Sequence, residues 1–432
     1  MAEKHLTEVR FDSLPLDAAV LAGIKRAGFE SCTPIQAETL PLALAGDDVA
    51  GQAQTGTGKT AAFLIATFNH LKRHPQMRGR RPQDPRAVIL APTRELAVQI
   101  HQDAVNLNHD TGFALSLAFG GTDYDKQRQQ IASGTDVLIG TPGRIIDYFK
   151  QKVFDFRYTQ VAVLDEADRM FDLGFIKDIR FVLRRMPEPT ERMNLLFSAT
   201  LSHRVLELAY EHMNDPGLVR IDPEQTTPEK VRQEIYFPAN HEKVPLLIGL
   251  LRRIDPRRTM IFVNRKRDAE ELQRYLEANK IHAEAISGDV AQKKRLRLLR
   301  DFQSGELPVL IGTDVASRGL HIPDVSHVFN FDLPDDPEDY VHRIGRTARA
   351  GAEGDAISLG CEDYAHNLPA IEDYVGYKIP VATIEPGTLS EVTRPGPRKR
   401  RNRDGPPPRN KSGGNNRPRN RRRRQGKPRN KD

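Results

Sequence analysis

The sequence predicts an α/β protein with two domains, each built on a mainly parallel sheet. Over residues 1–390, short apolar runs typical of strands alternate with stretches of helical periodicity. The runs are almost continuously apolar, as expected of strands that helices cover on both faces. They fall into two sets, separated by a polar segment with two prolines at residues 222–230. With 432 residues, the chain is also too long for one ordinary domain.

The apolar runs place the elements in order. The first set of expected strands comprises Asp48–Gly51, Ala87–Ala91, Val137–Gly140, Val161–Leu164 and Asn194–Phe197. The second set comprises Thr259–Val263, Ala283–Ile286, Val309–Gly312, His327–Phe331 and Asp355–Leu359. Helical stretches lie between them, such as Arg267–Ala278 with Ala269 and Leu272 on one face. We therefore expect domains at residues 1–221 and 231–390, with residues 222–230 as the linker.

The positive charge is concentrated at the C-terminal end. Residues 391–432 contain 17 Lys or Arg against 3 Asp or Glu, a net charge of +14, whereas residues 1–390 carry a net charge of −7. The C-terminal segment is rich in Arg, Pro, Asn and Gly and has almost nothing to bury, so we expect it to be disordered. Its charge density favours a nonspecific RNA tether, with a solvating tail or a nuclear-localisation run as alternatives.

Cysteine usage and hydropathy narrow the class of protein. Cys32 and Cys361 are the two cysteines and neither has a CxxC partner, which argues against a zinc site or a disulfide framework. No apolar run approaches the roughly 20 residues that a membrane-spanning helix needs. The first ten residues carry charges of both signs, so no signal peptide is expected. We predict a cytoplasmic protein without a membrane segment.

A phosphate-binding loop is predicted at Ala53–Thr60, which reads AQTGTGKT. Gly56 and Gly58 allow backbone N–H groups to curl around phosphate oxygens. Lys59 can reach the β- and γ-phosphates, and the Thr60 hydroxyl can bind Mg²⁺. An apparent strand precedes the loop and a helical run follows it, so a chance Gly/Thr-rich turn is the weaker interpretation.

A second motif, which is acidic, supplies the other groups that a hydrolytic nucleotide site needs. Asp165, Glu166, Ala167 and Asp168 directly follow the expected strand Val161–Leu164. This position places Asp165 at a carboxyl end of the sheet, where ligand sites of α/β proteins form. A carboxylate there can help to hold Mg²⁺, and a neighbouring group can orient the attacking water.

Together these motifs resemble the DEAD-box RNA helicases, over roughly residues 9–380. The resemblance implies two tandem RecA-like domains, RNA-stimulated ATP hydrolysis, and ATP and Mg²⁺ as ligands. It implies catalytic roles for Lys59, Glu166, Arg346 and Arg349, and Mg²⁺ binding through Thr60 and Asp165. It assigns ATP binding to Phe11, Phe29, Gln36, Ala53, Gln54, Thr55, Gly56, Thr57, Gly58, Lys59 and Thr60. In the family pattern, Gln36 reads the adenine edge and Phe29 stacks on the base.

The resemblance also assigns coupling and RNA contacts. Ser198, Thr200 and Asp168 correspond to residues that couple hydrolysis to strand separation. RNA contacts are implied for Pro92, Thr93, Arg94, Gly121, Thr141, Pro142, Gly143, Arg144, Gln292, Arg295, Thr313 and Arg318. Arg346 and Arg349 match an arginine finger that reaches the γ-phosphate. Such a group can accelerate phosphoryl transfer by roughly 10³–10⁵.

The sequence departs from the family pattern at His321, where an Asp normally contacts the ATP ribose, so that contact cannot be carried over. The segment around His321 is similar to helicases of bacterial RNA degradosomes. This similarity implies RNA turnover, with an RNase E-type endonuclease scaffold as partner and no stable DNA binding. Alternatives are an ATP-dependent RNA clamp, a ribosome-assembly helicase and a DNA-acting P-loop motor.

Overall fold

The computed structural model describes residues 6–53, 56–121, 123–221, 231–254, 257–287, 290–314, 325–347 and 354–396. Met1–Arg394 form one compact unit, and Pro395–Asp432 form a second, of which residues 395 and 396 are described. The predicted linker at 222–230 and nearly all of the Arg-rich C-terminal segment lie outside the described residues. No helix in the described ranges is long and apolar enough to cross a membrane.

The first domain contains a seven-stranded sheet in the order β3-β4-β2-β5-β6-β1-β7, in which every pairing is parallel. Its strands are β1 (Val49–Gln52), β2 (Ala87–Leu90), β3 (Leu115–Ala118), β4 (Val137–Gly140), β5 (Val161–Leu164), β6 (Met193–Ser198) and β7 (Gly217–Arg220). The central strands are buried along their whole length. This is the pattern that their continuous apolar runs predict.

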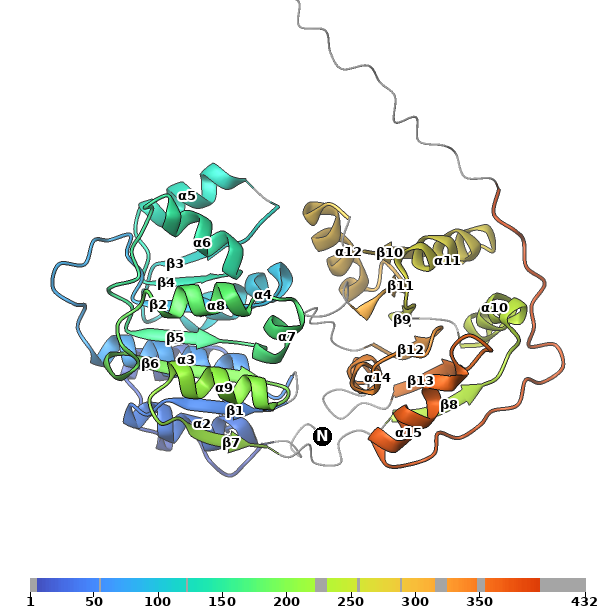
Figure 1. The fold of residues 1–432 in the computed structure, drawn as a ribbon, viewed down its shortest axis with the longest axis horizontal. Helices are drawn as coiled ribbons and strands as arrows, with labels where there is room; N and C mark the ends of the chain where they lie inside the picture. The colour runs from blue at the N-terminus through green and yellow to red at the C-terminus, as the bar shows by residue number, and fades with distance from the viewer. Residues whose placement is uncertain are drawn as a thin grey trace, which may run out of the picture. The chain divides into compact units, whose positions relative to one another are not determined.

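Helices cover both faces of the first sheet, as Figure 1 shows. One face packs against α1 (Ala18–Arg26), α2 (Pro34–Ala45), α3 (Lys59–Arg73) and α4 (Arg94–Leu107), with η1 (Phe11–Ser13) beside them. The other packs against α5 (Tyr124–Ala132), α6 (Pro142–Lys150), α7 (Ala167–Asp172), α8 (Ile176–Leu183) and α9 (His203–His212). A short turn, η2 (Pro189–Glu191), precedes β6.

The second domain contains a six-stranded parallel sheet in the order β10-β11-β9-β12-β13-β8. Its strands are β8 (Val231–Tyr236), β9 (Thr259–Phe262), β10 (Ala283–Ile286), β11 (Val309–Gly312), β12 (His327–Asn330) and β13 (Gly354–Leu359). Its described helical elements are η3 (Asn240–Glu242), α10 (Lys243–Ile254), α11 (Lys266–Ala278), α12 (Gln292–Ser304), α14 (Pro337–Ile344), η5 (Ala365–Asn367) and α15 (Leu368–Val375). The predicted α/β class, with two mainly parallel sheets, is confirmed.

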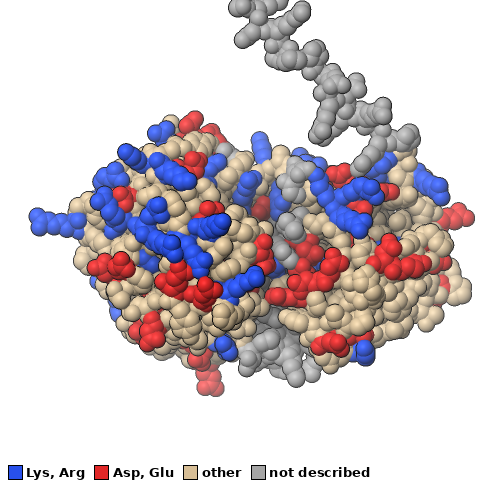
Figure 2. All heavy atoms as spheres, viewed as in Figure 1, with Lys and Arg blue, Asp and Glu red and all other residues tan. Residues whose placement is uncertain are grey.

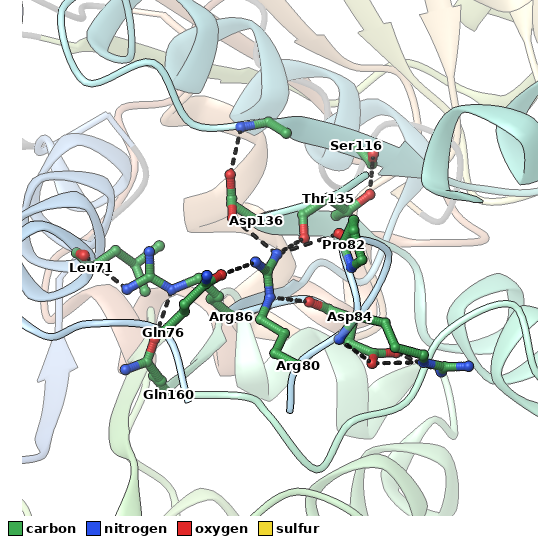
Figure 3. A network of polar contacts seen from close by, with 12 residues as sticks. Leu71, Gln76, Arg80, Pro82, Asp84, Arg86, Ser116, Thr135, Asp136 and Gln160 are labelled. Carbon is green, nitrogen blue, oxygen red and sulfur yellow. Dashed lines mark hydrogen bonds and ion pairs between the residues drawn. The ribbon is translucent and has the colours of Figure 1, made fainter. Parts of the chain in front are cut away.

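Buried polar networks fix the amino ends of the first sheet (Figure 3). The Arg86 guanidinium donates to the backbone carbonyls of Leu71 and His74 and to the side chain of Gln160. Arg80 donates to the Asp136 carboxylate at 2.9 Å. Because charged hydrogen bonds are strong when they are shielded from water, these contacts hold the amino ends of β2, β4 and β5 in register. The predicted motifs lie at the opposite edge of the sheet, where its strands end.

Candidate nucleotide and RNA site

The predicted motifs of the first domain meet at the carboxyl edge of its sheet. The phosphate-binding loop follows β1, Pro92 follows β2, and Thr141 follows β4. Asp165 follows β5, and Ser198 ends β6. Because all these strands are parallel, residues that are far apart in the sequence come together at one edge, where ligand sites of α/β sheets form.

The phosphate-binding loop is held by a side chain from the predicted adenine motif. Gly58 has a φ of +94°, and a Cβ at this position would lie 2.5 Å from the Gln36 amide nitrogen. Gln36 donates to the Gly58 carbonyl at 3.0 Å and accepts from the backbone N–H of Thr33 at 2.9 Å. Both ends of the Gln36 amide are therefore bonded in this structure, which adds a loop-fixing role to its predicted reading of adenine. Gln54 and Thr55 lie outside the described residues.

Lys59 and the acidic pair form the charged centre of the site. The Lys59 ammonium group is buried and donates to the Ala53 carbonyl at 2.7 Å. Asp165 is 3% exposed, and its burial raises the pKa of the carboxyl to about 7, although the charge of Lys59 opposes this rise. The ionised form of Asp165 therefore needs nearby positive charge to be stable at this edge of the sheet.

Glu166 occupies a backbone conformation that is costly for a side chain of this kind. Its φ is +52° and its ψ is +53°, in the left-handed region. The residue is 8% exposed, and its Oε2 atom has no hydrogen-bond partner within the described ranges. Left-handed backbone at a residue other than glycine costs about 1–3 kcal/mol and clusters at functional sites. The strain and the unsatisfied oxygen mark Glu166 as a candidate functional residue, and its role toward an attacking water stays a prediction.

The described residues suit a divalent cation beside Asp165. The buried carboxylate supplies a hard oxygen ligand, and Thr60, whose side chain carries a hydroxyl, lines the same cavity. A cation there would add to the charge of Lys59 and offset the cost of burying Asp165 in its ionised form.

The cavity at this edge has a volume of about 670 Å³. Its wall includes Phe29 from the segment after α1, together with Lys59, Glu166 and, from the second domain, Arg346. Phe29 is 43% exposed and is free to receive a flat base. Phe11, by contrast, is 2% exposed and packs behind Phe29, with 6.5 Å between the ring centroids.

Predicted RNA residues cluster at the ends of β2, β3 and β4. The Arg94 guanidinium packs against Gly121, where a Cβ would lie 2.5 Å from it and where φ is +84°. The Arg144 guanidinium lies 4.7 Å from the centroid of the Tyr124 ring and donates to the Tyr148 hydroxyl at 3.1 Å. Pro142 and Gly143 begin α6, and Thr93 caps α4 by accepting from the N–H of Leu96.

Some of the second-domain residues predicted to bind RNA or ATP lie within the described part of the chain. Gln292 donates to the Glu95 carboxylate at 3.0 Å, and Arg295 forms an ion pair with the same carboxylate at 2.6 Å. Thr313 follows β11. Arg318, His321 and Arg349 lie outside the described residues.

Sequence reasoning assigned no role to several residues near these motifs, although one of them, Arg343, stands within the segment that resembles the arginine-finger motif. Arg343 is 1% exposed, and its guanidinium binds the Asp314 carboxylate at 2.6 Å and 2.7 Å. Tyr124 supports Arg144 through its ring. Asp103 and Gln99 of α4 line the nucleotide cavity. The helical spacing of Gln99 and Asp103 from the cavity-lining Leu96 was the one available signal, and it does not identify a ligand.

Comparisons with known proteins agree with this geometry. Residues 33–208 match the DEAD/DEAH box helicase family model, and residues 242–351 match the helicase conserved C-terminal domain. An ATP-dependent RNA helicase RhlB of Xanthomonas oryzae is 60% identical over 93% of this chain and 69% of its own length. A protein of the same name from Cronobacter sakazakii is 56% identical over 96% of this chain and 99% of its own.

Solved structures show the same fold. Dbp5 of S. cerevisiae, bound to RNA and ADP BeF3, is 31% identical with a TM-score of 0.76, covering 86% of this chain and 95% of its own. Mss116p, bound to ssRNA and AMP-PNP, is 30% identical with a TM-score of 0.77, covering 89% and 83%. The chain therefore belongs to the DEAD-box family of ATP-dependent RNA helicases and, within that family, is similar to the bacterial RhlB type.

Proposed function

We propose that the protein hydrolyses ATP with RNA as its activator and uses the cycle to separate short RNA duplexes locally. The observation that carries this proposal is the arrangement at the carboxyl edge of the first sheet. Lys59, Glu166 and the first-domain residues predicted to bind RNA follow parallel strands at this one edge, and Asp168 links the acidic motif to Ser198 and Thr200. A nucleotide-dependent change at Glu166 can thus reach the segment that the family uses for coupling.

The proposed roles of the residues follow from their contacts. Lys59 neutralises phosphate charge, and Glu166 orients the attacking water through its unsatisfied carboxylate oxygen. Mg²⁺, held by Thr60 and Asp165, supplies charge neutralisation on the phosphates when it is bound. Arg346 lines the cavity and stabilises the charge that develops on the transferred group. Arg349 has the same proposed role.

RNA binding is proposed to depend on individual side chains that contact the sugar-phosphate backbone of the RNA, rather than on a broadly basic protein surface. On the face that Figure 2 shows, Lys and Arg side chains are interspersed with Asp and Glu. Arg94 and Arg144 are each held in place, against Gly121 and Tyr124 respectively. Fixed guanidinium groups suit phosphate recognition, which positions a strand without reading its sequence. The Arg-rich segment 391–432 is proposed as an additional, nonspecific RNA tether.

The proposed biological task is RNA turnover with an RNase E-type endonuclease scaffold in the cytoplasm. The similarity to proteins named RhlB supports this assignment. Recovery of such a nuclease with the full-length chain from cells would support the task, whereas recovery solely with pre-ribosomal particles would favour ribosome assembly. The proposed domain limits are residues 1–221 and 231–390.

Duplex displacement tests the proposed reaction. A short RNA duplex with a single-stranded extension is incubated with the protein, Mg²⁺ and ATP, and the released strand is measured together with phosphate. Strand release that requires ATP supports the proposal. RNA-dependent ATP turnover without any strand release would instead identify an RNA clamp, and equal stimulation by DNA would contradict RNA selectivity.

A further inference from the structure

One wall of the nucleotide cavity is a polar face of α4 that belongs to no predicted ATP motif. Leu96, Gln99, Asp103 and Asn106 all line the cavity. Because these residues are three and four positions apart, they share one face of the helix. The adjoining face of α4, which includes Ile100, packs into the core of the first domain. The packing of α4 against the core thus determines which of its residues face the cavity.

Asp103 is the charged residue on this wall, and its carboxyl has no partner among the described residues. Burial raises the pKa of Asp103 to about 6, and no neighbouring charge contributes to the shift. No hydrogen bond or ion pair joins Asp103 to any residue within the described ranges. Arg26, which lines the same cavity, is already paired with Asp110 at 3.2 Å. Asp103 is partly exposed and lines the cavity, so a ligand bound there could donate to its carboxylate without displacing a protein partner.

The cavity suggests a bound nucleotide as a partner for this carboxylate. The phosphate-binding residues Lys59 and Thr60 lie in the same cavity as the exposed ring of Phe29. A nucleotide with its phosphates at Lys59 and its base on Phe29 would place its sugar inside the cavity that α4 also lines. Sugar hydroxyls can donate hydrogen bonds, and an ionised carboxylate acts only as an acceptor. The family position that normally provides a carboxylate for the ribose is His321 in this sequence.

We propose that Asp103 accepts a hydrogen bond from a ribose hydroxyl of the bound nucleotide and so makes the site select ribonucleotides over deoxyribonucleotides. This inference rests on the proposed ATP-dependent function and adds a specificity residue to it. Asp103 touches the sugar and not the reacting phosphate, so it acts on nucleotide affinity rather than on the chemical step.

The test measures ADP binding to the full-length chain with Mg²⁺ by isothermal titration calorimetry. Wild type, Asp103→Ala and Glu38→Ala are each titrated with ADP, 2′-deoxy-ADP and 3′-deoxy-ADP. Glu38 is an exposed acidic residue of α2 outside the cavity and serves as the matched control. In wild type and Glu38→Ala, removal of the contacted hydroxyl is expected to weaken binding about tenfold. Asp103→Ala should weaken ADP binding by a similar factor and leave the affinity for that deoxy analogue unchanged.

Thermal unfolding without nucleotide separates this role from a structural one. Because the Asp103 carboxyl has no partner in the described part of the chain, Asp103→Ala should leave the melting temperature unchanged or raise it. Equal weakening of ADP and both deoxy analogues, or unchanged ADP affinity, would overturn the inference while leaving ATP binding intact. A wild-type chain that does not bind ADP at all would overturn the proposed function as well.

Discussion

The carboxylate of Asp168 accepts hydrogen bonds from the backbone N–H groups of Ala199 and Thr200, at 3.1 and 3.0 Å. In return, the Ser198 hydroxyl accepts from the backbone N–H of Asp168 at 3.2 Å. These contacts tie the segment after β5 to the end of β6. Since Asp168 is two residues from Glu166, these hydrogen bonds connect the proposed ATP site directly to the segment proposed to couple hydrolysis to strand separation.

We predict that Asp168→Ala uncouples hydrolysis from strand separation. The substitution leaves the N–H groups of Ala199 and Thr200 without this acceptor, which should destabilise the fold by about 1–3 kcal/mol. The number of duplexes separated per ATP hydrolysed should fall more than ATP turnover itself. Both quantities are measured on the same sample, with the exposed Glu191→Ala as a control. A proportional loss of both activities would argue against a coupling role.

Gly58→Ala should strain the phosphate-binding loop in two ways. The φ of +94° disfavours a side chain, and the new Cβ would meet the Gln36 amide. We expect a loss of about 1–3 kcal/mol in the free energy of unfolding. Denaturant titrations of Gly58→Ala, Gln36→Ala and the double variant form a cycle. If the clash contributes, Gln36→Ala should cost less in the Gly58→Ala background than in wild type, whereas strict additivity would show that the backbone strain alone matters.

Tyr124 is predicted to act on RNA affinity through Arg144. Its ring lies under the Arg144 guanidinium, at 4.7 Å from the centroid, and restricts where that charge can go. Tyr124→Ala should weaken the binding of single-stranded RNA about threefold to tenfold in the presence of an ATP analogue. Tyr124→Phe keeps the ring and should bind RNA almost as wild type does. Fluorescence anisotropy with labelled RNA measures both, and equal losses in the two variants would contradict the stacking role.

His70 should make the fold sensitive to acid. Burial, reinforced by the positive charges of His74 and Arg86, lowers the pKa of His70 to about 4 from an ordinary value near 6.5. The unfolded chain therefore takes up the proton first, and stability that is complete above about pH 6.5 is lost as the pH falls toward 4. The loss attributable to His70 is on the order of 3 kcal/mol at most.

Denaturant unfolding of wild type and His70→Asn between pH 4 and 7 measures this contribution. The difference in unfolding free energy between the two proteins should shrink or change sign as the pH falls, because Asn does not titrate. The exposed His366→Asn serves as the control for replacing a histidine outside this buried cluster. A His70→Asn difference that stays constant from pH 7 to 4 would contradict the assignment.

The sequence predicted the central strands well because burial on both faces produces continuous apolar runs. The expected strand Ala87–Ala91, for example, is β2 at Ala87–Leu90. The strands β3, β7 and β8 were not predicted. Each is half exposed at or beside a sheet edge, and polar residues such as Ser116 and Arg232 interrupt its apolar pattern.

The site was predictable where a motif records the chemistry and obscure where tertiary packing creates it. Lys59 and Glu166 stand in short motifs whose residue types match phosphate binding and hydrolysis. The bonding of Gln36 to Gly58 and the position of Asp103 beside the same cavity depend on how α2, α3 and α4 pack together. No local sequence pattern encodes such contacts, so only the folded structure reveals them.

The most direct test of the central claim is ATP hydrolysis measured with RNA, with DNA of matched sequence and without nucleic acid, for wild type and Glu166→Gln. The substitution keeps the size of the side chain and removes the charge that orients water. The account predicts stimulation by RNA but not by DNA, and a loss of at least about 100-fold in the RNA-stimulated rate of Glu166→Gln with ADP binding retained. RNA-stimulated hydrolysis that survives in Glu166→Gln, or equal stimulation by DNA, would contradict it.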